Sequence, residues 1–227
     1  MLRESIGHCD GLESLTAEIG LSGRAGTQRL RGRLVVGLAA PESVRLEAVA
    51  PFGAPYFLLA GEGGTATLFF PREGQVLRDA PVEDILGALA GIDVPASDLR
   101  AWLAGCPAHA GRIDEARAYD GGWAAADLAG GRTAWFRQTE NTWRLVAVST
   151  PEMTIEFGEH AGAQPTRVRF RRAAAQDRGE LDVRLALSQV ETNVSLPDAA
   201  FDLDIPGDAV EITLEELRQS GPLRGSK

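Results

Sequence analysis

The chain has 227 residues, of which 44% are hydrophobic and 24% are charged, a composition typical of a globular protein and unlike that of a disordered one. Its formal net charge is −9, so the basic surface that non-specific nucleic-acid binding requires is not expected. The same acidity argues against electrostatic docking on anionic lipid, and it leaves a hydrophobic mode of membrane contact open.

No apolar run in the sequence is long enough to span a bilayer. The first ten residues, MLRESIGHCD, lack the apolar core of a secretory signal peptide. We therefore expect any export signal or lipid anchor to lie outside this sequence.

The first predicted element is a short amphipathic helix from Leu2 to Leu15, whose apolar contacts are Leu2, Ile6, Leu12 and Leu15. Gly7 and Gly11 weaken this helix. From Glu18 onward, apolar and polar residues alternate in short runs separated by Gly- and Pro-rich turns. This pattern predicts about six antiparallel strands with one wet face in the first third of the chain.

Two short helices are predicted between Asp79 and Cys106. The first opens with Asp79 as a capping residue and Pro81 in its first turn, and it ends at Gly91. The second starts near Ser97. Their apolar stripes consist of Val82, Ile85, Leu86 and Leu89 in the first helix, and Leu99, Trp102 and Leu103 in the second.

Helices of this length are not stable alone in water, so both must lie on an apolar surface. We expect Trp102 and Leu103 to face the concave side of the sheet and Arg100 to face water. After a predicted loop from Pro107 to Gly122, about six more strands and a short terminal helix near Thr213 complete the chain.

The sequence therefore predicts a mainly β (α+β) single domain over residues 1–227. Many short strands with Gly-rich turns are typical of one strongly curved antiparallel sheet or of a barrel. The two mid-chain helices would plug or cover the inner face of that sheet. Short terminal helices would flank it.

No constellation for catalysis or metal binding is recognisable. His8, His109 and His160 lie far apart, and GxSxG, P-loop, GxGxxG and HExxH motifs are absent from the sequence. Cys9 and Cys106 stand outside any metal-ligand spacing. They either form a disulfide in an oxidising compartment or stay unpaired. We expect no catalytic residue, no metal and no cofactor.

The function of two further features depends on whether their side chains face solvent or the core: a run of alternating arginines and an aromatic residue in a turn. Arg167, Arg169 and Arg171 alternate with apolar residues, and a solvated sheet face explains them better than a phosphate site does. Phe52 lies in the turn PFG, between Pro51 and Gly53, where polar residues are usual. On residue type alone, an aromatic side chain there is favoured to tuck under the sheet.

Several blocks of the sequence resemble the bacterial lipoprotein-localisation (LolA/LolB-like) family, and within it the LolB-like branch of outer-membrane lipoprotein receptors. The blocks are LRGRLVVGLAAPESVRLEAVAPFGAPYFLLAGEGGTATLFF, then ILGALAGIDVPASDLRAWLAGCP, and finally LPDAAFDLDIPGDAVEI. The resemblance covers roughly residues 12–215. In the helical block it rests on Leu86 and Gly87 or Leu89 and Gly91, then on Pro95, Leu99, Trp102, Leu103 and Gly105.

This resemblance implies an unclosed antiparallel half-barrel with a helical lid over an apolar cavity. It implies a non-enzymatic carrier or receptor, in the periplasm or at the outer membrane, that takes up acyl chains of lipoproteins or another lipid. A loop with an exposed apolar residue would deliver the cargo to the inner surface of the outer membrane, and here that loop is Pro51, Phe52 and Gly53. The cargo would come from a periplasmic carrier protein. Cys9 lacks a preceding lipobox, so no lipid anchor is assigned to it.

Under this interpretation, apolar residues of the strands and the lid line the cavity. The expected lining residues are Leu34, Val36, Leu46, Phe57, Leu59, Leu68, Phe70, Ile85, Leu86, Leu89, Leu99, Trp102 and Leu103. The alternative is a structural or interaction module of a cell-envelope assembly, with a filled β core and a protein partner at the Phe52 loop.

Overall fold

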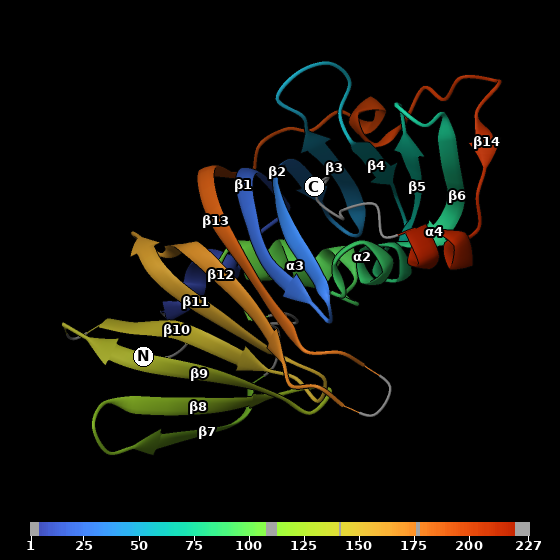
Figure 1. Cartoon of the computed structure of the whole chain (residues 1–227). Coiled ribbons are helices and arrows are strands. Elements are labelled where there is room, and N and C mark those ends of the chain that lie inside the picture. The colour runs from blue at the N-terminus through green and yellow to red at the C-terminus, as the bar shows by residue number, and fades with distance from the viewer. Residues whose placement is uncertain (1–4, 108–112, 141, 176–177, 221–227) are drawn as a thin grey trace.

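A computed structural model describes residues 5–107, 113–140, 142–175 and 178–220 (Figure 1). Within them, one curved sheet of 14 strands dominates the molecule. The elements in chain order are η1 (Gly7–Cys9), β1 (Ser14–Ala25), β2 (Gln28–Ala39), β3 (Ser43–Val49), β4 (Phe57–Gly61), β5 (Thr65–Phe70), β6 (Gln75–Pro81), α2 (Val82–Ala90), α3 (Ala96–Leu103), β7 (Ile113–Tyr119), β8 (Trp123–Leu128), β9 (Arg132–Thr139), β10 (Thr142–Ser149), β11 (Thr154–Ala161), β12 (Gln164–Arg172), β13 (Leu181–Thr192), η2 (Asp198–Phe201), β14 (Val210–Glu211) and α4 (Leu214–Ser220).

The sheet consists of two halves that meet at its centre. Strands β1–β6 form one half and β7–β13 the other, and antiparallel pairing of β1 with β13 joins them. The short strand β14 adds to β6 in parallel at one edge, and β7 forms the opposite edge. The two edges do not pair, so the sheet is an unclosed half-barrel, as the family resemblance implied.

Helices α2 and α3 cross the concave face of this sheet, behind β1 and β2 in Figure 1. The predicted two-helix segment is therefore confirmed. Gly91 ends α2 in the left-handed conformation, with φ of 71°, which suits a residue without a side chain. Asp79 was wrongly predicted as a cap: it lies in β6, and Pro81 occupies the N-cap position. Ser97 lies in the first turn of α3, after Pro95 at the N-cap.

The prediction for the chain's start was wrong in part. Leu15, placed in a helix from Leu2 to Leu15, lies in β1, where its backbone pairs with Leu38. Within the described residues, Ser5 is helical, and a 3-10 turn at Gly7–Cys9 lies between it and that strand. A spacing of three or four residues between leucines fits a helix, but pairing with β2 outweighs this weak local preference.

The terminal helix α4 is confirmed, and its start has a capping box. The Thr213 hydroxyl accepts a hydrogen bond from the Glu216 N–H at 3.2 Å, and the Glu216 carboxylate accepts one from the Thr213 N–H at 2.7 Å. The predicted loop from Pro107 to Gly122 was wrong in part, since β7 occupies residues 113–119. None of the helices in the described parts of the chain is long and apolar enough to cross a membrane.

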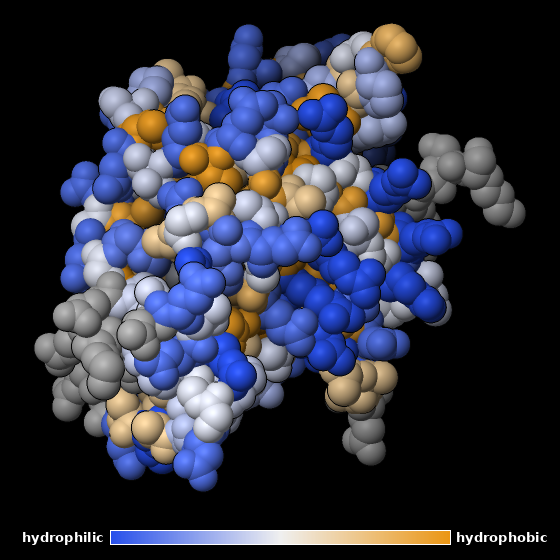
Figure 2. Space-filling model, turned by 90° about the vertical axis from the view of Figure 1, so that its left-hand side faces the viewer, coloured by the Kyte–Doolittle hydropathy of each residue, from blue (hydrophilic) through white to orange (hydrophobic). Residues whose placement is uncertain are grey.

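Side chains alternate between the two faces of the sheet. In β13, Leu181, Val183 and Leu185 are buried on the concave side, and Asp182 and Arg184 lie on the convex side. Figure 2 shows the side of the molecule at the left in Figure 1, where hydrophilic side chains cover most of the surface. The hydrophobic core therefore lies between the concave face and the two helices.

Candidate functional site

An apolar cavity of about 60 Å³ lies between the sheet and the lid, which we define as residues 82–105. Both the sheet and the lid contribute to its walls, and every lining side chain is apolar. The lining residues are Ile19, Leu21, Leu34, Val36, Leu46, Phe57, Phe170 and Leu185 from the sheet, and Leu86, Leu89, Ala90, Ile92, Leu99 and Leu103 from the lid.

The structure places only part of the predicted set around this cavity. The predicted residues that line it are Leu34, Val36, Leu46, Phe57, Leu86, Leu89, Leu99 and Leu103. The others, Leu59, Leu68, Phe70, Ile85 and Trp102, are buried in the surrounding core. Trp102, for example, packs edge-on against Phe170 with the ring centroids 5.9 Å apart, and it does not border the void.

Sequence reasoning missed the contributions of β1, β12 and β13. Phe170 and Leu185 share the apolar phase of their strands, so the signal for a concave position was present. Ile19 and Leu21 follow the same alternation in β1. What the sequence lacks is a signal that the cavity lies below the join between the two halves.

The cavity is small, since a water molecule's share of liquid volume is about 30 Å³. At about 60 Å³ it has room for a few methylene groups and not for a long acyl chain. In this structure, helices α2 and α3 therefore fill most of the space over the concave face. A ligand of that size requires the lid to move away from the concave face.

One tether of the lid is a buried ion pair. Asp98, in the first turn of α3, is 1% exposed, and its Oδ2 atom lies 2.7 Å from Nη2 of Arg132 in β9. The pair connects the lid to the second half of the sheet. Because a buried charge is costly unless it is paired, this contact favours one position of α3.

A second tether lies at the connection between α2 and α3. The Asp93 carboxylate lies 3.0 Å from Nη1 of Arg178 and 3.7 Å from Nη1 of Arg172. Arg172 also donates to the Gly91 carbonyl at 3.3 Å. Gly87 makes room for this group, since a Cβ there would meet Asp93 Oδ1 at 2.0 Å. We call this contact the Asp93 latch, and it is more exposed than the Asp98 pair.

The turn between β2 and β3 holds the outer side of α3. The Ser97 hydroxyl donates to Glu42 at 3.3 Å, and the Arg100 guanidinium donates to the Pro41 carbonyl at 3.1 Å. Arg100 does not simply face water, as predicted, because it is partly buried against this turn. Burial lowers the pKa of Arg100, against the opposing effect of the nearby Glu42 carboxylate.

The loop between β3 and β4 projects Phe52 into solvent. Its side chain is 90% exposed, so the interpretation of a tucked side chain was wrong. Arg72 supports the loop from the β5–β6 turn, donating to the carbonyls of Phe52 at 3.0 Å and Ala54 at 2.8 Å. The Arg72 guanidinium also lies 4.5 Å from the centroid of the Tyr56 ring. The backbone of this loop is thus fixed by hydrogen bonds, while the Phe52 side chain remains exposed to solvent.

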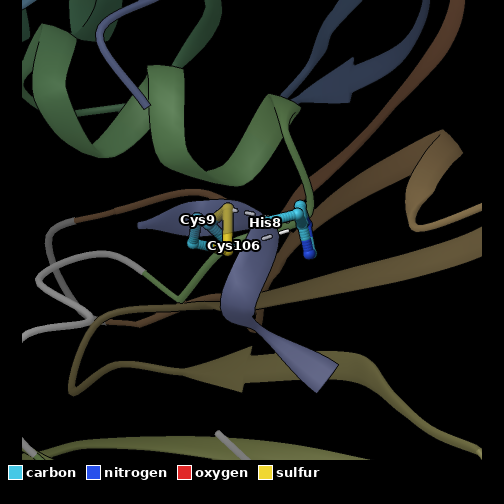
Figure 3. A group of neighbouring side chains, drawn as sticks. All are labelled: His8, Cys9 and Cys106. Carbon is cyan, nitrogen blue, oxygen red and sulfur yellow. Dashed lines mark hydrogen bonds between the residues drawn. A yellow bond between two sulfur atoms is a disulfide. The ribbon is translucent and has the colours of Figure 1, made fainter. Parts of the chain in front are cut away.

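The two cysteines form a disulfide. Cys9 and Cys106 are joined with their Cα atoms 5.7 Å apart, which ties η1 to the end of the lid. Figure 3 shows the His8 side chain beside this bond, and its Nε2 atom lies 3.6 Å from the Cys9 sulfur and 3.2 Å from the Ala104 carbonyl oxygen. Disulfide sulfurs are not thiolates, so this group lacks the ligand chemistry of a zinc site.

The histidines do not form a catalytic group with one another and an acid in the described parts of the chain. His160 lies in β11, and burial together with Arg144 lowers its pKa. His8 lies beside the disulfide. His109 lies outside the described residues.

Comparison with known proteins identifies related folds. The model of the family described as outer membrane lipoprotein LolB matches residues 15–197. A LolA superfamily protein from Nitrosomonas europaea has a TM-score of 0.56 and 14% sequence identity, over 88% of this chain and 97% of that chain. A DUF1329 family protein from Desulfovibrio piger has a TM-score of 0.54 and 14% identity, over 88% of this chain and 94% of that chain. A comparison with curated proteins finds no match.

Proposed function

The chain belongs to the LolB family of outer membrane lipoproteins, and from this premise we propose that it is a non-enzymatic carrier or receptor for acyl chains. The chains would belong to lipoproteins, or to another lipid. They would enter between the concave face of the sheet and the lid, and the protein would deliver them to the outer membrane. A periplasmic carrier protein would supply them.

The observation that carries this proposal is the wholly apolar lining of the cavity beneath the lid. Burial of each methylene group of an acyl chain contributes about 0.8 kcal/mol, so long chains would bind almost irreversibly in a preformed pocket. A closed lid changes this balance. Its leucines already fill most of the space, so the cost of displacing them offsets part of the binding energy and permits release.

The Phe52 loop supplies a means of delivery. An exposed aromatic residue on a braced loop can enter the headgroup region of a bilayer without unfolding any part of the protein. The Cys9–Cys106 disulfide fits an oxidising compartment such as the periplasm. Both features support a site of action at the inner surface of the outer membrane.

The proposal is tested with a fluorescent fatty-acid probe and the variant Phe52→Ser. Saturable probe binding to the wild-type protein, equal binding to the variant, and loss of probe transfer to vesicles by the variant would all support it. Tyr119→Ser, which removes an aromatic side chain 47% exposed in β7 at the opposite edge of the sheet, is the control and should keep most of the transfer. Absence of saturable binding would overturn the proposal.

The small volume of the cavity favours a second candidate. A module with a permanently filled core would use the Phe52 loop to hold a protein partner of the cell envelope. It would bind no fatty-acid probe at any concentration. Phe52→Ser would then weaken capture of a protein partner, and neither the wild type nor the variant would interact with vesicles.

A further inference from the structure

The positive charges of this acidic protein are not spread evenly. On the convex face, next to the hairpin turn that joins β1 and β2, Arg24, Arg29 and Arg31 are all exposed. The register places Arg24 directly opposite Arg29, and Ser22 between Arg31 and Arg184. Like charges directly opposite each other destabilise a sheet. Asp182, which the register places opposite Arg24 on the β13 side, offsets part of this cost, but no acid lies directly opposite Arg29 or Arg31 among the described residues.

These arginines surround a trough of about 680 Å³ on the sheet surface. Small residues form its floor. Ser22 is exposed there, and Gly23 allows β1 to approach β13 closely, since a Cβ at this position would meet the Asp182 carbonyl oxygen at 2.1 Å. The charged rim consists of Arg24, Arg29, Arg31, Arg184 and the single acid Asp182.

Two acids near the trough, Asp182 and Glu156, are already engaged, and a third, Glu180, lies at the hairpin turn, where its carbonyl accepts a hydrogen bond from the Gly26 N–H at 2.7 Å. Asp182 accepts hydrogen bonds from Arg169 on both oxygens, each at 2.8 Å, and lies 2.9 Å from Arg184. Glu156 accepts one from Arg171 at 2.9 Å. These pairs match the solvated face expected for β12. Within the described residues, by contrast, Arg24, Arg29 and Arg31 form no ion pair.

The trough and the Phe52 loop lie at the same end of the strands. Val49, the last residue of β3, pairs with Arg33 of β2. The loop that carries Phe52 therefore leaves the sheet two residues from Arg31. From Arg33, β2 continues five residues to Gln28, which is about 16 Å at the rise of a strand. An apolar anchor and a set of cations without ion pairs thus lie at the same end of β2.

We propose that Arg24, Arg29 and Arg31 form a docking site for anionic phospholipid headgroups, which acts with Phe52 when the protein meets a membrane. This inference rests on the proposed function, since it gives a lipid partner to the delivery step. Guanidinium groups bind phosphate through charge-assisted hydrogen bonds. The net charge of −9 argued against electrostatic docking on lipid, but it is a sum over the whole surface, and a membrane meets only one part of that surface.

The experiment measures co-sedimentation of the full chain with two kinds of vesicle, one of phosphatidylcholine alone and one with about one-third phosphatidylglycerol. The test variant is R24Q/R29Q/R31Q. The control variant R78Q/R117Q/R218Q removes the same charge from β6, β7 and α4, where each arginine is exposed and ion-paired. Melting temperature and fatty-acid probe binding are measured for every protein.

The wild type and the control should prefer anionic vesicles, and added salt should weaken this preference. Each arginine near an anionic surface contributes about a fivefold factor in affinity, so the test variant should lose on the order of 100-fold on anionic vesicles only. Phe52→Ser should weaken binding to both kinds of vesicle.

Equal binding of the wild type and the test variant to anionic vesicles would overturn the inference. A test variant that still binds these vesicles and no longer captures a protein partner would overturn it as well. Normal probe binding together with either result would leave the carrier function standing. Absent probe binding would refute the carrier function itself, whatever the vesicles show.

Discussion

Asp98 Oδ2 lies 2.7 Å from Arg132 Nη2, and this ion pair joins helix α3 of the lid to strand β9 in the far half of the sheet. The carboxylate is almost fully buried, with 2% of its side chain exposed. The segment that directly follows this helix is held by the Cys9–Cys106 disulfide. The connection between α2 and α3, by contrast, is held by the more exposed Asp93 latch. Helix α2 is joined to α4 by the exposed pair of Arg218 with Asp84 at 3.3 Å, so α3 carries the buried ion pair of the lid and α2 an exposed one.

Asp98→Ala is expected to destabilise the whole protein. It leaves the guanidinium of Arg132, only 20% exposed, without the charge opposite it. Breaking a buried pair in this way costs about 3 kcal/mol in the free energy of unfolding. Urea denaturation measures the change. The control, Glu211→Ala, breaks the exposed pair with Arg78 and should change little. Equal midpoints for the two variants would contradict a tethering role for Asp98.

The sequence predicted the lid because its signals are local. The leucine stripe of α2 has the period of a helix, and Gly91 supplies the stop. The edge strand β7 was missed because alanines blur the alternation in IDEARAY. Period two likewise shows that Leu46 and Leu59 share a face of the sheet. It does not show that Leu46 borders the cavity and Leu59 does not, because this depends on where the lid sits.

The sequence pattern likewise predicts which face of the sheet an arginine lies on, but not whether it forms an ion pair. Alternation placed Arg169 on a solvated face, and the structure places it there, paired with Asp182. The same pattern in β2 cannot reveal that Arg31 forms no ion pair among the described residues, since the residue opposite it, Ser22, comes from β1, and the next one across, Arg184, comes from β13. The pairing of distant strands, and hence the trough, follows from topology that the sequence does not display.

Leu34→Phe is expected to weaken acyl binding with little effect on stability. Leu34 borders the cavity, and a larger apolar side chain there can grow into the void. We expect the affinity for a fluorescent fatty acid to fall about tenfold and the free energy of unfolding to change by about 1 kcal/mol at most. The comparison variant is Leu128→Ala, buried in β8, a strand that contributes no residue to the cavity lining, and it should cost about 2–5 kcal/mol and leave probe affinity nearly unchanged. The opposite pattern would place the binding site elsewhere.

Asp93→Asn is expected to strengthen acyl binding. The latch stabilises the closed lid, so its removal lowers the cost of opening, and exposed ion pairs of this kind contribute up to about 1 kcal/mol. Probe affinity should therefore rise about twofold to fivefold. Gly87→Ala should act in the same direction, because its methyl group displaces the Asp93 carboxylate. Glu18→Gln, which breaks the Arg33 pair on the convex face, should have no effect. Unchanged affinity in both latch variants would show that this connection does not control opening.

Reduction of the Cys9–Cys106 disulfide is expected to destabilise the protein and loosen α3. The two cysteines are separated by 97 positions in the sequence, and a crosslink over a loop of this length stabilises the folded state by about 5 kcal/mol, mainly by restricting the unfolded chain. The urea midpoint should fall when reductant is added, and probe dissociation should become faster because the end of the lid loses its link to η1. The variant C9S/C106S should show both changes without reductant and no further response to it. A midpoint that is the same in oxidised and reduced protein would mean that packing around Cys106, 2% exposed, holds this end of the lid by itself.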